Sequence, residues 1–167
     1  KSVETIKIPD PENKKPNHRF ESRCVIKAIA DIEGKEICFL ICHMGLNLSE
    51  QKNAVETICR LLDEIRIPVI LMGDFNTTPD DKVLKPIRKL MKDTDDLNPI
   101  KNRGTYPSDK PKKKIDYIFY RDLNCFKTET IQEIFSDHLP IISYFEFWKP
   151  SVKSIGTRLN LSSKRGG

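Results

Sequence analysis

The stretch VILMGDFNTTP, residues 69–79, restricts the choice of fold more than any other part of the chain. Its first four residues are apolar without interruption, and a strand with apolar side chains on both faces is typical of a covered strand in an α/β protein. Gly73 then permits a sharp turn, and Asp74 and Asn76 follow directly. Burying a carboxylate there is costly unless a cation or a hydrogen-bond donor meets it. The end of this strand is therefore the first candidate for a functional site.

The remaining segments predict strands and helices in mixed order. Apolar and β-branched patterns predict strands over 2–9, 22–32, 35–43, 69–72, 114–120, 125–134 and 139–148. Apolar residues at helical spacing predict helices over 48–67, with Ser49 as N-cap, and over 80–91, with Pro86 near its start or at a kink. The strand over 35–43 is apolar on both faces, so it should be central and covered on both sides. These elements predict an α/β sandwich. We expect the strands that end at His43 and Met72 and the strand that follows His138 to lie side by side in one sheet.

The excess positive charge is confined to the end of the chain. Of 29 basic and 24 acidic residues, five basic and no acidic ones fall in 149–167, so residues 1–148 are balanced. We predict one domain over 1–148 and a flexible basic tail over 149–167. The balanced body lacks the charge excess of a nucleic-acid binder. The exception is KPKKK at 110–114, which fits either a solvated turn or a phosphate-attracting rim.

Cysteine usage and hydropathy bear on the compartment. The five cysteines form no CxxC pair and most lie in apolar runs, which argues against a disulfide framework or a thiolate metal site. No stretch approaches the roughly 20 apolar residues that cross a bilayer, and the first ten residues lack the apolar core of a signal peptide. A reducing compartment is expected, with the cytoplasm favoured.

Polar residues lie at or near the ends of four predicted strands. They are His43, Asp74 with Asn76, Asp116, and Asp137 with His138. Oxygen ligands suit Mg²⁺ or Mn²⁺, a carboxylate can deprotonate a water, and imidazole or amide donors can stabilise phosphate oxygens. The set predicts metal-assisted phosphoester hydrolysis. Taken singly, each residue also fits a turn, an N-cap or an ion pair, such as one between Asp116 and Lys114 or Arg121.

The motifs HMGL, GDFN, IDYIF and SDHLP occur in that order. The sequence from about residue 20 to 147 thereby resembles the endonuclease/exonuclease/phosphatase superfamily, which includes DNase-like nucleases, deadenylases and sphingomyelinase-like enzymes. The resemblance implies a DNase I-like fold, a β-sandwich flanked by helices, of which this chain has the C-terminal portion. It also implies hydrolysis with Mg²⁺ or Mn²⁺ of a phosphate ester, which the sequence leaves open between nucleic acid, phospholipid and small molecule.

The resemblance implies roles for the matching positions. Asp74 would orient and deprotonate the attacking water, and Asn76 would stabilise the pentavalent state or touch the metal. His138 would contact the scissile phosphate, with Asp116 fixing its tautomer and His43 as a further phosphate donor. The implied metal ligands are Asp74, Asn76, Asp137 and His138. Tyr106, in GTYPSD, fits either stacking on a base or sugar or packing within its loop.

One part of the family pattern has no counterpart. Its N-terminal half supplies an Asn and a metal-ligating Glu, often after Gln, and no such pair precedes HMGL. The acids upstream, none in that context, are Glu4, Asp10, Glu12, Glu21, Asp31, Glu33 and Glu36. Either the chain is a fragment, or another chain supplies the missing half, or the metal site is incomplete. A half-sandwich also leaves one sheet face open, so a homodimer or a missing N-terminal half is expected to cover it. The alternative function is a catalytically incomplete binding module.

Overall fold

A computed structural model describes residues 1–14, 19–101 and 103–147, and the predicted tail over 149–167 lies outside the described residues. The elements are β1 (Ser2–Lys7), β2 (Cys24–Ile32), β3 (Lys35–His43), α1 (Leu48–Glu64), β4 (Val69–Asp74), η1 (Lys82–Leu84), α2 (Lys85–Leu90), β5 (Lys92–Asp93), η2 (Thr94–Leu97), β6 (Asp116–Arg121), β7 (Leu123–Thr130) and β8 (Ile141–Phe147). Each predicted strand and helix is therefore present, with boundaries shifted by a few residues.

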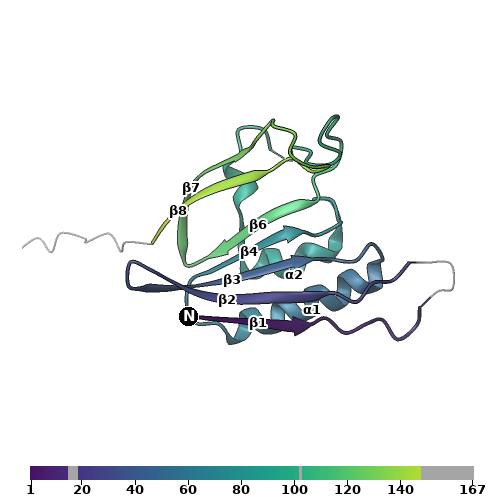
Figure 1. Cartoon of the computed structure of the whole chain (residues 1–167), viewed down its shortest axis with the longest axis horizontal. Coiled ribbons are helices and arrows are strands. Elements are labelled where there is room, and N and C mark those ends of the chain that lie inside the picture. The colour runs from purple at the N-terminus through teal and green to yellow at the C-terminus, as the bar shows by residue number, and fades with distance from the viewer. Residues whose placement is uncertain (15–18, 102, 148–167) are drawn as a thin grey trace, which may run out of the picture.

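The strands form two sheets, one large and one small. The larger sheet has the order β1-β2-β3-β4-β6-β5, and β7 pairs only with β8. Helices α1 and α2 lie behind the larger sheet, while β7 and β8 stand on its other side (Figure 1). This is the mixed α/β arrangement expected from the sequence, with a two-stranded second layer.

Alternation along the central strands divides the apolar residues between the two faces. Cys38 and Leu40 of β3 and Leu71 of β4 are fully buried in the core that the sheet shares with the helices. The neighbouring Ile37 and Ile70 point to the opposite face and pack in a second, smaller cluster with residues of β7 and β8. The second cluster is small because only two strands cover that face.

The start of α1 differs from the prediction. The N-cap is Asn47 rather than Ser49. The carboxylate of Glu50 accepts a hydrogen bond from the backbone N–H of Asn47 at 3.1 Å, which is the reciprocal half of a capping box. Ser49 could not form this motif, because the residue three positions after it is Lys52, which has no side-chain acceptor.

Two expectations about the sheets are also wrong. The strand that follows His138, β8, was expected beside β3 and β4, but it belongs to the smaller sheet, and β6 takes its place beside β4. β3 is central, yet it is not covered on both sides: Ile41 on its second face remains 37% exposed. The second difference follows from the first: β7 and β8 form a separate layer of two strands, which is too narrow to cover the larger sheet.

The cysteines are free thiols, and most of them are buried. All five cysteines are unpaired, and Cys38, Cys42 and Cys125 are buried. Burial raises the pKa of the Cys42 thiol to about 12, so this residue next to His43 is an inert part of the core. Within the described residues, no helix has both the length and the apolar character needed to span a membrane.

Candidate active site

Sheet register brings three of the predicted site residues into one row. β3 runs parallel to β4 and pairs His43 with Asp74, while β6 runs antiparallel to β4 and pairs Asp74 with Asp116. Directly paired residues project to the same face of a sheet. The three side chains therefore start from adjacent strands on the face opposite the helices, at one end of the sheet.

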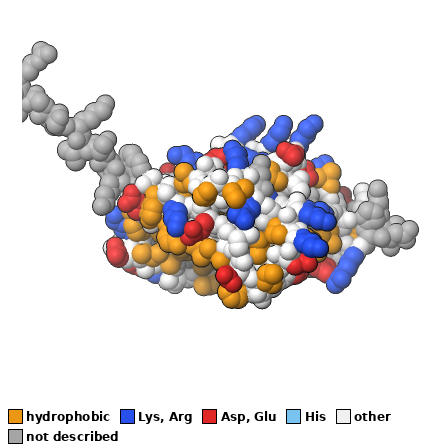
Figure 2. All heavy atoms as spheres, turned by 90° about the horizontal axis from the view of Figure 1, so that it is seen from above, with side chains coloured by type: hydrophobic (Ala, Val, Ile, Leu, Met, Phe, Trp, Pro, Cys, Tyr) orange, Lys and Arg blue, Asp and Glu red, His pale blue; other side chains and the backbone are white. Residues whose placement is uncertain are grey.

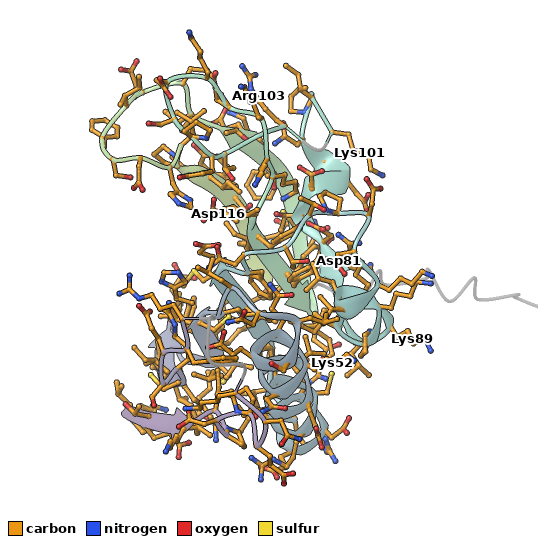
Figure 3. The ribbon with its side chains drawn as sticks, turned by 90° about the vertical axis from the view of Figure 1, so that its right-hand side faces the viewer. Lys52, Asp81, Lys89, Lys101, Arg103 and Asp116 are labelled. Atoms are coloured by element: carbon orange, nitrogen blue, oxygen red, sulfur yellow. The ribbon has the colours of Figure 1, made fainter. Side chains whose placement is uncertain are left out.

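The loop before β8 completes this row with His138. Ligand atoms of Asp74, Asp116 and His138 all lie within 4.8 Å of one another. Asp74 and His138 line a cleft of about 580 Å³, and Asp116 contacts His138 next to it. Asp116 lies near the middle of Figure 3, between the larger sheet and its helices below and the loops beside β7 and β8 above. The cluster is thus placed where the two layers meet.

Asp116 holds the imidazole of His138. The Nδ1 atom of His138 lies 2.8 Å from Oδ2 of Asp116, and both side chains are largely buried. Burial alone would lower the pKa of His138, but the hydrogen bond to Asp116 and the charges of Asp116, Asp74 and Asp137 outweigh it and raise that pKa. Such a pairing fixes the tautomer and favours the imidazolium form. This geometry supports the predicted link between the two residues.

Asp74 is mostly buried and lies beside His43. Its side chain is 15% exposed, and its Oδ2 atom is 3.3 Å from Nε2 of His43. Burial raises the pKa of Asp74, the hydrogen bond from the backbone N–H of Asn76 opposes that rise, and the charge of Asp116 adds to it. A carboxylate with a raised pKa is a better proton acceptor than an ordinary one. These surroundings suit the role of a general base.

Asn76 is fixed in the turn that follows. It adopts a left-handed φ of 48°, and its backbone N–H donates to Oδ1 of Asp74 at 2.8 Å. Its Nδ2 atom donates to the carbonyl of Met44 at 2.9 Å. Asn tolerates this backbone conformation better than most residues. The turn therefore holds the carboxylate and the carboxamide in a defined relation.

Gly73 makes the approach of β3 and β4 feasible at this point. Its φ is +142°, and a Cβ atom placed on it would lie 1.8 Å from the carbonyl oxygen of Cys42. No side chain fits there without moving the backbone of β3. The sequence-based expectation of a turn at Gly73 is wrong, because β4 continues through Gly73 to Asp74 and the turn falls at Asn76. Glycine is required here for the close approach of the backbone of β3.

Replacing Gly73 with Ala should destabilise the fold by at least about 3 kcal/mol, because backbone strain adds to a direct clash with β3. Gly34→Ala is the matched control, since Gly34 also has a positive φ of +79°, but nothing lies within 4 Å of the position that its new methyl group would take. That control should cost only about 1–2 kcal/mol. Urea unfolding of both variants measures the difference, and equal losses would contradict the clash.

Two further predicted residues lie beside the cluster. The exposed carboxylate of Asp137 lines the cleft but is outside the group of Asp74, Asp116 and His138. Tyr106 also lines the cleft, and its ring centre is 4.9 Å from that of His138. It is 37% exposed, so its ring is accessible beside the imidazole. This position is compatible with stacking on a substrate.

The lysine cluster KPKKK has two different structural roles. Lys113 lines the cleft together with Tyr106, and the two residues are paired in an isolated β-bridge. Lys114 is not solvated as expected for a turn: it is 4% exposed, and its Nζ atom donates to the backbone carbonyl of Asp116 at 2.9 Å. Burial lowers the pKa of Lys114, opposed by the charges of Asp93 and Asp95. Lys114 therefore stabilises the start of β6 through its hydrogen bond to the backbone of Asp116.

Sequence reasoning missed one wall of the cleft. Arg19, Glu21, Arg23 and Glu50 line it on the side of His43. An alternating R-x-E-x-R pattern in an extended segment is the signal that could have found the first three, because alternate residues share a face. His18, in the same loop, lies outside the described residues.

Solved structures share this fold. A mannosyl-6-phosphatase of Bacteroides thetaiotaomicron has a TM-score of 0.74 at 16% identity, covering 87% of this chain and 66% of its own. An endonuclease/exonuclease/phosphatase family protein of Leptotrichia buccalis has a TM-score of 0.67 at 27% identity, covering 88% and 61%. D. rerio TDP2, complexed with single-strand DNA product, has a TM-score of 0.63 at 19% identity, covering 87% and 67%.

The chain covers only part of the length of each of these solved structures. It spans 61% to 67% of the length of those three proteins. No curated protein matches it in sequence. The model of the Endonuclease/Exonuclease/phosphatase family matches residues 21–138, from the arginine-rich wall of the cleft to His138. The fold is DNase I-like, and the chain belongs to the endonuclease/exonuclease/phosphatase family.

Proposed function

We propose that this chain carries the site of a divalent-metal-dependent phosphoesterase. The observation that carries the proposal is the convergence of Asp74, Asp116 and His138, with ligand atoms within 4.8 Å, beside His43. The family and the phosphate-ester chemistry named for two of its neighbours, a phosphatase and a protein with bound DNA product, support the same class of reaction.

Each side chain has a task in such a hydrolysis. Asp74, with its raised pKa, takes the proton from the attacking water. His138, kept protonated by Asp116, donates to a phosphate oxygen as negative charge develops there. His43 and Asn76 add donors or ligands from the neighbouring strand and turn, and Tyr106 offers a ring to the rest of the substrate.

The donor set fits Mg²⁺ or Mn²⁺. Two carboxylates and an imidazole converge in the cluster, and the Asn76 amide and the Asp137 carboxylate lie near or in the same cleft. Oxygen-rich sets of this kind suit hard divalent cations. Asp74, Asn76 and Asp137 would hold such an ion through their oxygen atoms, while the protonated His138 faces the phosphate. When bound, the ion would polarise the phosphate and offset its negative charge. Asp116 sits close enough to contribute as well.

A further layer is proposed to cover the open face of the larger sheet. Val3, Ile26 and Ile41 share that face and are 73%, 38% and 37% exposed. The smaller sheet has apolar residues on its outside too, with Phe126 58% and Tyr144 39% exposed. Figure 2 shows apolar side chains among Lys and Arg on the surface seen from above. Either a second copy of the chain or an N-terminal half of the domain would bury this surface.

The proposed function is tested by metal depletion. Hydrolysis of a phosphodiester and a phosphomonoester is measured for the chain alone and in its full-length context. EDTA should abolish turnover, and added Mg²⁺ or Mn²⁺ should restore it. Turnover that persists in EDTA would refute the metal dependence. Phosphate-ester binding without hydrolysis in either form would instead establish the alternative, a catalytically incomplete binding module.

A further inference from the structure

The arginine-rich wall of the cleft is a ladder of three alternating side chains, Arg19, Glu21 and Arg23. Glu21 bridges the two guanidinium groups: Oε1 lies 2.7 Å from Nη2 of Arg19, and Oε2 lies 2.5 Å from Nη2 of Arg23. One carboxylate thus serves two cations. With Glu50, which accepts a hydrogen bond from the backbone N–H of Glu21, this wall of the cleft is balanced in charge. All three side chains line the cleft that contains Asp74 and His138.

Two residues that line the cleft carry buried polar atoms without hydrogen-bond partners in the described part of the chain. Among the side-chain nitrogens and oxygens of the described residues, two are buried without a hydrogen-bond partner, Nε of Arg23 and Oγ1 of Thr77. Both residues line this cleft, and Thr77 is only 4% exposed. Buried donors are almost always paired in folded proteins, so the guanidinium of Arg23 has one donor that its contact with Glu21 leaves unsatisfied.

The ladder is set apart from the catalytic row. Arg23 directly precedes β2, and β3 separates β2 from β4, which carries Asp74. Neighbouring strands lie about 4.8 Å apart, so the backbone at Arg23 is about 10 Å from the strand of Asp74. The guanidinium of Arg23 contacts Glu21 at that side of the cleft, whereas the carboxylate of Asp74 contacts His43, so the two groups can bind different phosphates of one substrate.

We propose that Arg19 and Arg23 bind a second phosphate of the substrate, with Glu21 occupying the two guanidinium groups until that phosphate displaces it. Arg is suited to this because its planar fork donates two parallel hydrogen bonds to phosphate oxygens. The inference rests on the proposed function, since it assigns a further contact within the same cleft. The substrate class is an ester with at least two phosphate groups, either a polynucleotide or a multiply phosphorylated small molecule.

Opposite effects of two variants test the ladder. Binding of orthophosphate, fructose 1,6-bisphosphate and single-strand tetrathymidylate is measured by calorimetry at fixed Mg²⁺. Arg23→Gln should weaken at least one of the two larger ligands about tenfold and leave orthophosphate nearly unchanged. Glu21→Gln should tighten the same ligand, because it frees both guanidinium groups. Whichever larger ligand responds identifies the source of the second phosphate.

Arg60→Gln is the matched control, because it removes the same charge from an exposed site on α1 that is not part of the cleft. It should leave all three affinities unchanged, and circular dichroism checks the fold of each variant. Equal weakening of orthophosphate by Arg23→Gln would place Arg23 on the scissile phosphate and overturn the proposal. Unchanged affinities in both ladder variants would also overturn it. Neither result depends on turnover, so the proposed hydrolysis is tested separately.

Discussion

Asp74→Asn is expected to lower kcat by about 10² or more while KM changes little. The variant keeps the shape of the side chain and an oxygen that can accept the backbone N–H of Asn76, now 2.8 Å from Oδ1 of Asp74. It removes the uptake of a proton from water in the transition state, and saturating Mg²⁺ offsets any loss of the carboxylate as a metal ligand. Steady-state kinetics in saturating Mg²⁺, in the full-length context, measure both constants.

The same variant should be more stable than the wild type near pH 7. Burial is the main reason that the folded-state pKa of Asp74 is raised above its unfolded value. The contribution of Asp74 to the stability of the fold is therefore greatest below the unfolded pKa, and it is lost as pH rises through the folded pKa. At neutral pH the ionised carboxylate is a net cost that Asn removes. Asp63→Asn, at an exposed position of α1, is the matched control and should alter neither kcat nor Tm. Near-normal turnover of Asp74→Asn would refute its role as base.

His138→Ala should lower kcat strongly, and Asp116→Asn should lower it less. His138 contacts the phosphate in the proposed mechanism, whereas Asp116 acts through His138 by the 2.8 Å hydrogen bond to Nδ1. Once the imidazole is gone, adding Asp116→Asn should cost almost nothing further in kcat. The full double-mutant cycle, measured at one Mg²⁺ concentration, tests this dependence.

Additive losses in that cycle would show that Asp116 acts independently of His138. Its place in the cluster of ligand atoms makes direct metal ligation the specific alternative. In that case the Mg²⁺ concentration needed for half-maximal rate would rise in Asp116→Asn even in the absence of His138. The cycle therefore separates an orienting role from a ligating one.

The parts of the site that the sequence predicts share a local cause. His43, Asp74 and Asp116 lie at the ends of clearly apolar strands, and pairing of those ends follows once the strands enter one sheet. The need for glycine at position 73 has another cause than the predicted turn, since a side chain there would clash with the carbonyl of Cys42 on the neighbouring strand. The mixed α/β class and the family follow from the same motifs, and both are confirmed.

The parts that the sequence did not predict depend on contacts between distant segments. Nothing local in IISYFEF shows that β8 pairs with β7 instead of β3 or β4, because strand pairing is set by packing across the sheet. Lys114 looks like a solvated lysine until β6 and η2 enclose it near Asp95, 3.8 Å away. One unpredicted feature has a local cause instead: the N-cap is Asn47, and its capping partner Glu50 lies only three residues further on.

Paramagnetic relaxation by Mn²⁺ tests the central claim most directly, because it reports on the metal site of this chain whether or not the chain turns substrate over. In an amide NMR spectrum, Mn²⁺ should broaden the signals of Asp74, Asn76, Tyr117 and His138 at low occupancy. Signals from the opposite end of the sheet, at Lys35, Val69 and Arg121, should stay sharp. Preferential broadening at the acidic residues Asp93, Asp95 and Asp96, with the cluster around Asp74 unaffected, would contradict the account.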